Sequence, residues 1–154
     1  MKNTLTCITG DENTQPLTPQ LSALVEFYHA FNHRDIDAMC ANWAHTDDIA
    51  MSNPLGGIKR GWTEIQSVYE RIFTGRTRVY VEYYDFVCHH GDDMFCVIGR
   101  ERGNFQAGET RVELAIRTSR IFQMLDGHWR QIHHHGSIDD PELLARYQHA
   151  VRAE

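Results

Sequence analysis

The chain has 154 residues, of which 42% are hydrophobic and 23% are charged, with a formal net charge of −6. This length suits one domain with a real core, and this composition excludes a disordered chain. No Lys/Arg run stands out and no segment is long and apolar enough to span a bilayer, which argues against nucleic-acid and membrane partners. The N-terminus lacks the apolar core of a signal peptide and the four cysteines show no CxxC spacing, so we expect reduced thiols and a cytoplasmic protein.

The first part of the chain divides into a tail and a helix. Residues 1–17 are polar and aperiodic, which predicts a flexible N-terminal tail before a single domain over residues 18–154. Thr18 followed by Pro19 is typical of a helix start. Apolar residues then recur at helical spacing as far as Phe31, which predicts a first helix with one apolar face.

Further start and stop signals follow in order. Asp35 is placed to cap a second, short helix. A short strand is expected around Asp48–Ser52, where a proline ends the ladder soon after. Helical spacing returns after Gly61 and again from Pro141, which predicts a third helix and a C-terminal one.

Between the last two helices the hydrophobic period changes to two. β-branched and aromatic residues dominate four segments that are separated by short turn sequences, namely Thr77–His89, Asp93–Gln106, Glu109–Met124 and His128–Ser137. Strands joined this tightly form an antiparallel meander, and their length indicates a bent sheet. Helices followed by such a sheet predict an α+β fold, with the sheet wrapped around the first helix and a pocket on its concave side.

Several fragments resemble a known family when they are taken together. The most specific is the final strand, Asp126 to Ser137, of the form D-G-x-W-x-x-x-H-x-H-x-S. Weaker ones precede it in order, namely Trp43, Asn53-Pro54-Leu55-Gly56, Gly61-Trp62 and Arg117-Thr118-Ser119-Arg120. Over roughly residues 18–138 the chain resembles the SnoaL-like branch of the nuclear transport factor 2-like, or ketosteroid isomerase-like, superfamily. The resemblance implies a cone-shaped, cystatin-like fold, a deep pocket and a homodimer packed through the outer sheet.

The resemblance does not imply one activity, because the superfamily holds isomerases, dehydratases, cyclases, epoxide hydrolases and non-catalytic domains. Aligned to ketosteroid isomerases, Asn53 stands where those enzymes carry the general-base aspartate. Phe27 stands where they carry the oxyanion tyrosine, with Tyr28 one residue away. An amide cannot abstract a proton and a phenyl ring cannot donate one, so isomerisation by the usual Asp/Tyr mechanism is not expected.

Two histidines of the last strand are the candidate catalytic residues. His133 and His135 alternate with Ser137, which places all three on one face together with Trp129 and Gln131, and the family pattern puts that face inside the cone. The pair suits acid–base catalysis near neutral pH, or two metal ligands, or a polar lining of the pocket. No third ligand is convincingly spaced, so we expect no metal and no cofactor.

Other candidate ligand-binding residues surround them. Arg117 and Ser119 share a face with Glu113, so Arg117 suits either a ligand's carboxylate or phosphate or an ion pair with Glu113. Asn53 suits a ligand hydrogen bond or an Asx turn before Pro54. The aromatic residues that could form a pocket wall, or plain core, are Trp43, Trp62, Tyr28 and Tyr83.

Two functions stay open at this point. One is a cofactor-free isomerase, lyase or hydrolase that acts on a small, partly apolar molecule through His133 or His135. The other is a non-catalytic module for ligand binding or dimerisation. A homodimer is expected in both, because apolar side chains would lie on the outer face of the sheet, namely Ile132, Val112, Leu114 and Ile116.

Overall fold

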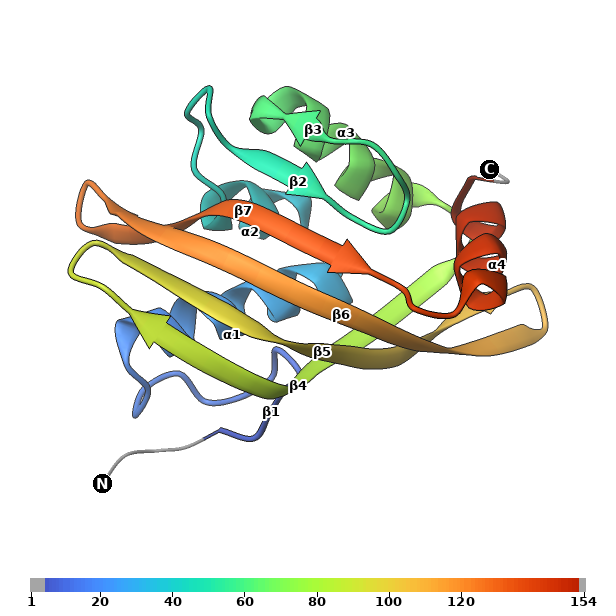
Figure 1. The fold of residues 1–154 in the computed structure, drawn as a ribbon, viewed down its shortest axis with the longest axis horizontal. Coiled ribbons are helices and arrows are strands. Elements are labelled where there is room, and N and C mark those ends of the chain that lie inside the picture. Colours follow the sequence, from blue (N-terminus) through green and yellow to red (C-terminus); the bar gives the residue numbers. More distant parts are fainter. Residues whose placement is uncertain (1–4, 153–154) are drawn as a thin grey trace.

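The computed structural model, which describes residues 5–152, contains the four long strands that the sequence predicts. They are β4 (Arg78–His90), β5 (Met94–Ala107), β6 (Thr110–Leu125) and β7 (His128–Ser137). Each pairs antiparallel with the next, without interruption between β5 and β6 and with one register shift each between β4 and β5 and between β6 and β7. Together they form the long, bent sheet that dominates the molecule (Figure 1).

Three short strands extend this sheet at its edges. They are β1 (Cys7–Ile8), β2 (Ala50–Ser52) and β3 (Lys59–Arg60), and the order across the sheet is β1-β4-β5-β6-β7-β2-β3. The sheet is antiparallel except where β2 runs parallel to β7. The turn signals of the sequence did not predict that parallel pair, because β2 reaches β7 through tertiary packing and not through a hairpin.

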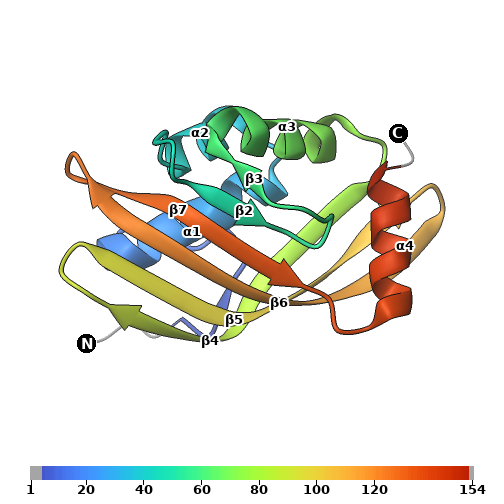
Figure 2. The ribbon, with the colours of Figure 1, turned by 45° about the horizontal axis from the view of Figure 1, so that its top comes forward.

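Four helices complete the α+β fold. They are α1 (Pro19–Asn32), α2 (Ile36–Asn42), α3 (Gly61–Thr74) and α4 (Pro141–Arg152). The predicted caps are present, since the hydroxyl of Thr18 and the carboxylate of Asp35 each accept a backbone N–H of the first turn. Figure 2 shows α1, α2 and α3 gathered on one side of the bent sheet, with α4 across one end. None of the described helices is long and apolar enough to cross a membrane.

The hydrophobic core lies between α1 and the concave face of the sheet. From α1, Leu24, Phe27 and Tyr28 are almost fully buried. They face inward-pointing residues of the strands, which include Val81, Tyr83, Val97, Phe105, Leu114 and Phe122. The bent sheet predicted from the meander is therefore wrapped around α1, in agreement with the cone that the resemblance implies.

The N-terminal segment differs from the expected flexible tail. Ile8 is fully buried, and Cys7 and Ile8 pair with Tyr84 and Tyr83 of β4. Residues 5–17 thus belong to the packed domain, although their sequence has no periodicity. Two apolar residues suffice here because β4 offers a free edge for them to pair with. Residues 1–4 of the expected tail lie outside the described part of the chain.

The expected faces of β6 are the reverse of those in the structure. Val112, Leu114 and Ile116 were expected on the outer face, but all three are buried against the interior. Glu113 and Arg117 were expected inside, and both are exposed on the outer face. The alternation itself was correct. The assignment of the two faces was wrong because burying the apolar side chains in the core is favourable. The charged side chains of Glu113 and Arg117 stay in contact with solvent, because burying them would be costly.

Candidate functional site

The orientation of the last strand depends on one extra residue. Along β6, Phe122 pairs with Gln131 of β7, but the preceding Ile121 pairs with His133, so Ile132 is an unpaired bulge residue. A bulge of this kind reverses the alternation beyond it. Gln131 points inward as expected, whereas His134, not His133 or His135, is the buried histidine.

His133 and His135 therefore lie on the outer face, and their expected position inside the cone is wrong. Nδ1 of His133 lies 2.9 Å from the backbone oxygen of Ala50 in β2. His135 is exposed and pairs across the sheet with Ser119 and Ser52. Their ring centroids are 6.5 Å apart. They lie on the opposite face of the sheet from the buried polar groups of the interior.

A buried arginine organises the interior. Arg120 lies on β6 with the same parity as Leu114 and Ile116, and 1% of its surface is exposed. Its Nη1 donates to Gln131 Oε1 at 2.8 Å, and its Nε donates to the Tyr28 hydroxyl at 3.3 Å. The guanidinium carbon lies 3.6 Å from the ring centroid of Phe27, which is a cation–π contact. Burial disfavours its charge, but Tyr28 and the nearby carboxylate hold the pKa of Arg120 above its usual value.

That carboxylate belongs to Glu101 of β5, which is 4% exposed. Its Oε1 lies 3.8 Å from Nη2 of Arg120 and accepts a hydrogen bond from the hydroxyl of Thr118. Burial raises the pKa of Tyr69 on α3 to about 12, so its phenol stays neutral. Among residues 5–152, the interior thus contains the cation Arg120, the carboxylate of Glu101 and neutral hydroxyl groups within a mostly apolar shell.

His134 is the unusual member of this cluster. Both ring nitrogens are buried, and neither has a hydrogen-bond partner within the described residues. Burial lowers the pKa of His134 well below its usual value, and the positive charge of Arg120 lowers it further. The ring is therefore neutral at pH 7, with one donor nitrogen and one acceptor nitrogen. Gly136 gives it room, since a Cβ there would lie 3.1 Å from Nε2 of His134.

These groups meet at a small interior cavity with a volume of about 40 Å³. It is bounded by apolar and aromatic side chains together with Glu101, Arg120, His134, Asn53, Tyr69 and Tyr147. A cavity of this size holds on the order of a few water molecules. Tyr147 comes from α4, whose Gln148 donates to the Pro54 oxygen at 2.9 Å, so α4 closes the interior at that end.

The expected ligand-binding residues divide into two groups. Tyr28 and Trp43 are buried inside the cone, and Asn53 lines the interior cavity. The side chain of Asn53 also accepts the N–H of Leu55 at 3.1 Å, which is the Asx turn considered from the sequence. Phe27 lines the cavity as well. Asn53 and Phe27 therefore occupy the cavity without the carboxylic acid and the phenol that ketosteroid isomerases are expected to carry at these two positions.

The remaining candidates are not brought to the cavity. Arg117 donates from Nε to Ser137 at 3.1 Å and its Nη2 lies 2.9 Å from Asp139, so its ion pair is not with Glu113. Glu113 lies 3.7 Å from Arg111 instead. Ser119 lies on the same outer face. Trp62 is stacked on His45 with ring centroids 5.3 Å apart, outside the cavity lining.

Sequence reasoning missed Arg120, Glu101 and His134. A signal for the first was present, because the buried positions of β6 continue in steps of two from Leu114 to Arg120. A charged residue at the end of an apolar alternation indicates a buried, partnered ion. Glu101 lies between two arginines in the sequence and offers no such signal, and the bulge that orients His134 has no signature in a single sequence.

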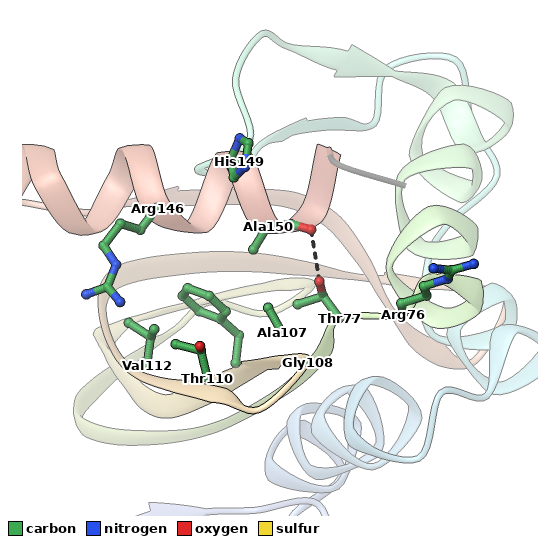
Figure 3. A pocket seen from close by; sticks show the side chains of 10 residues that line it. Arg76, Thr77, Ala107, Gly108, Thr110, Val112, Arg146, His149 and Ala150 are labelled. Atoms are coloured by element: carbon green, nitrogen blue, oxygen red, sulfur yellow. Dashed lines mark hydrogen bonds between the residues drawn. The ribbon is translucent and has the colours of Figure 1, made fainter.

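A larger hollow of about 630 Å³ lies between α4 and the β5–β6 hairpin (Figure 3). Its lining includes Arg76, Arg146 and His149. In Figure 3 the ends of Arg76 and His149 are directed away from the centre of the groove. Arg76 and His149 therefore do not converge in this hollow, whereas Arg120, Glu101 and His134 line the smaller interior cavity together, which makes that cavity the better candidate site.

Comparison with known proteins agrees with the observed fold. Residues 21–141 match the sequence model of the SnoaL-like domain. A ketosteroid isomerase-like protein from Erwinia carotovora atroseptica is 22% identical, with a TM-score of 0.67 over 84% of this chain and 100% of that one. A candidate dehydratase of the NTF2-like family from Streptomyces avermitilis is 17% identical, with a TM-score of 0.66 over 75% and 91%. A candidate calcium/calmodulin-dependent protein kinase type II association domain from Thiobacillus denitrificans is 26% identical, with a TM-score of 0.61 over 77% and 93%. A search of curated proteins finds no significant match.

Proposed function

The chain belongs to the SnoaL-like domain family, and from this premise we propose that it binds a small, partly apolar molecule bearing a carbonyl or carboxylate group inside its cone. The single observation that carries the proposal is His134, a buried neutral imidazole whose two nitrogens have no partner among the described residues and which lines the cavity together with Arg120 and Glu101. Leaving such a group unpaired costs about 1–3 kcal/mol, which a ligand's hydrogen bonds would recover.

The cavity groups suit distinct roles toward such a ligand. Arg120 is a fixed positive charge that stabilises a carboxylate or a developing oxyanion. His134 donates one hydrogen bond and accepts another, so it can deliver or remove a proton at an adjacent atom. Glu101 also lines the cavity, and its carboxylate could accept a proton from the ligand in place of His134. This set favours cofactor-free proton transfer, as in an isomerase or a lyase.

Access requires a movement, because about 40 Å³ does not accommodate an organic ligand. We infer that α4 moves. It supplies Tyr147 to the cavity wall, and all but its first residue lie beyond the part of the chain that matches the family model. Its hydrogen bonds to the rest of the domain include Gln148 to Pro54 and Thr77 to the Ala150 oxygen at 2.9 Å. A further bond runs from Arg152 to the Leu55 oxygen. Each of these bonds involves a single side chain, so the helix can lift while the backbone ladders of the sheet stay intact.

The test is a fluorescence titration that uses Trp43, which is buried beside the cavity residue Tyr69 at 6.4 Å between ring centroids. The probes are cyclohex-2-enone for the carbonyl class and benzoate for the carboxylate class. At least one should bind the wild-type protein, and His134→Leu should weaken that binding about tenfold or more. The matched control is His135→Leu on the outer face of the same strand, which should bind as the wild type does. Equal binding by His134→Leu, or binding of neither probe, contradicts the proposal.

A second function, assembly without a ligand, is favoured by one observation. Val87, Met94 and Ile98 are 55%, 39% and 44% exposed, and Val87 pairs with Ile98 on the outer face of the sheet. Exposed apolar residues that gather on a sheet face are typical of an isologous interface. We propose a homodimer through this face. The two functions are compatible, and the titration above separates pure assembly from assembly with ligand binding.

A further inference from the structure

A cluster of possible metal ligands lies on the surface, away from the interior cavity. Asp11, His29 and His33 each offer one ligand atom, and these atoms all lie within 4.8 Å of one another. His29 and His33 are four residues apart at the end of α1, so their rings share one face of the helix, with centroids 4.2 Å apart. The carboxylate comes from the N-terminal segment, which packs against that face.

The distances match what a transition metal requires. Nε2 of His33 lies 2.9 Å from Oδ1 of Asp11, and Nδ1 of His29 lies 3.8 Å from the same oxygen. Zinc–ligand bonds of about 2.0–2.1 Å in tetrahedral geometry place neighbouring ligand atoms roughly 3.3 Å apart, between these two values. A bound metal would replace the proton that His33 shares with Asp11. Nδ1 of His29 lies 3.0 Å from the backbone oxygen of Gly10, so the His29 ring would turn away from that oxygen to bind the metal.

The segment that supplies Asp11 is held by several contacts. Asn32 donates to the Thr9 oxygen at 2.8 Å, and the Glu12 carboxylate accepts the backbone N–H groups of Thr9 and Gly10. Gly10 has a φ of +98°, and a Cβ there would lie 2.3 Å from the backbone nitrogen of His29. Only glycine permits this approach, so the backbone places Asp11 against α1 before any metal arrives.

We propose that Asp11, His29 and His33 bind one divalent transition metal ion of the zinc type. Two imidazoles and one carboxylate are the donor set that zinc accepts in three-ligand sites, which leave a position for water. The side chains of the histidines are about half exposed, at 49% and 50%, so solvent reaches the remaining position. Bound metal would fasten the N-terminal segment to α1.

The test is a zinc titration of untagged, EDTA-treated full-length protein by calorimetry. Wild type should bind one equivalent, and Asp11→Asn and His33→Ala should each weaken the affinity about tenfold or more. The matched control is the double variant His133→Ala/His135→Ala, which removes a two-histidine pair on the outer sheet face and should bind as tightly as wild type.

Two further readouts make the outcome decisive. Zinc should raise the melting temperature of wild type and of the control more than that of Asp11→Asn, because the stabilisation by a bound ligand falls as its affinity falls. Cobalt(II) should give visible absorption with wild type that Asp11→Asn lacks. The proposal is overturned if wild type binds no zinc, if Asp11→Asn binds as tightly as wild type, or if the control variant loses the site. Circular dichroism checks that each variant is folded.

Discussion

At the scale of single residues, buried polar atoms of Trp43, Tyr69 and His134 lack a hydrogen-bond partner among the described residues, and His134 is the one in which two atoms are unpaired. His134 has no hydrogen-bond partner among the described residues, unlike Arg120, whose donors reach Tyr28 and Gln131. Natural proteins retain such a group where it serves a function, because it lowers stability. The contrast between a satisfied arginine and an unsatisfied histidine is the reason to place ligand chemistry at His134.

His134→Leu should therefore raise the free energy of unfolding, by about 1 kcal/mol, because an apolar side chain removes a buried unpaired polar group. Urea denaturation of both proteins measures the difference. Gln131→Leu on the same strand should do the opposite, since it leaves Arg120 and Asn42 without the partners they have at 2.8 and 3.1 Å. A His134→Leu protein less stable than wild type by a similar amount would show that the ring is a structural element.

The same histidine predicts a dependence of stability on pH. The pKa of His134 in the folded protein lies well below the ordinary value of 6.5. Between the folded pKa and pH 6.5, the unfolded chain therefore binds more protons than the folded protein does. The stability due to the neutral ring is present above pH 6.5 and is lost as pH falls below it toward the folded pKa. Urea midpoints measured from about pH 7 to about pH 5 should fall less steeply for His134→Leu than for wild type. Identical slopes would mean that His134 titrates normally.

At the scale of secondary-structure elements, α4 and the bulge in β7 decide what the interior contains. The bulge at Ile132 turns His134 inward, and α4 adds Tyr147 and closes the open end. The long central strands are joined by continuous backbone ladders, whereas the hydrogen bonds between α4 and other elements involve single side chains, such as Gln148, Thr77 and Arg152. The helix should accordingly be the part that opens.

Hydrogen–deuterium exchange should detect this opening. Amides of α4 should exchange faster than those of β5 and β6, because local opening of the helix costs less than unfolding of the sheet. Gln148→Ala should accelerate α4 further by removing the bond to Pro54. Arg146→Ala, on the exposed side of the same helix, should have little effect on it. Protection in α4 equal to that in the central strands would exclude it as the route to the cavity.

At the scale of the whole molecule, the outer sheet face is the expected dimer interface, but with different residues from those first predicted. The apolar set is Val87, Met94 and Ile98, whereas Val112, Leu114 and Ile116 are in the core. Ile98→Glu should convert the dimer to a monomer, because two symmetry-related charges would be buried at the interface.

Sedimentation equilibrium at micromolar concentration measures this effect. Ile58→Glu is the matched control, since Ile58 is 56% exposed but lies in the segment between β2 and β3, away from the outer face. It should remain dimeric. A wild-type monomer, or dissociation caused equally by both substitutions, would contradict a dimer through the outer face.

The local elements were predictable because their determinants are local. The caps at Thr18 and Asp35 start the first two helices where expected, and the hairpin turns separate four strands whose ends differ from the predicted ones by about a residue. The family pattern in the final strand then indicated the cone. Each of these features depends on neighbours within a few positions, and sequence periodicity records such neighbours directly.

The site was decided only by tertiary structure, because an alternating strand has two faces and sequence alone does not say which is inside. One unpaired residue, Ile132, moved His133 and His135 out and His134 in. The pairing of Arg120 with Glu101, like the contact of Asp11 with His33, joins residues from separate elements. Such contacts exist only after the chain has folded, since burial and strand register, and not residue type, determine which polar groups meet.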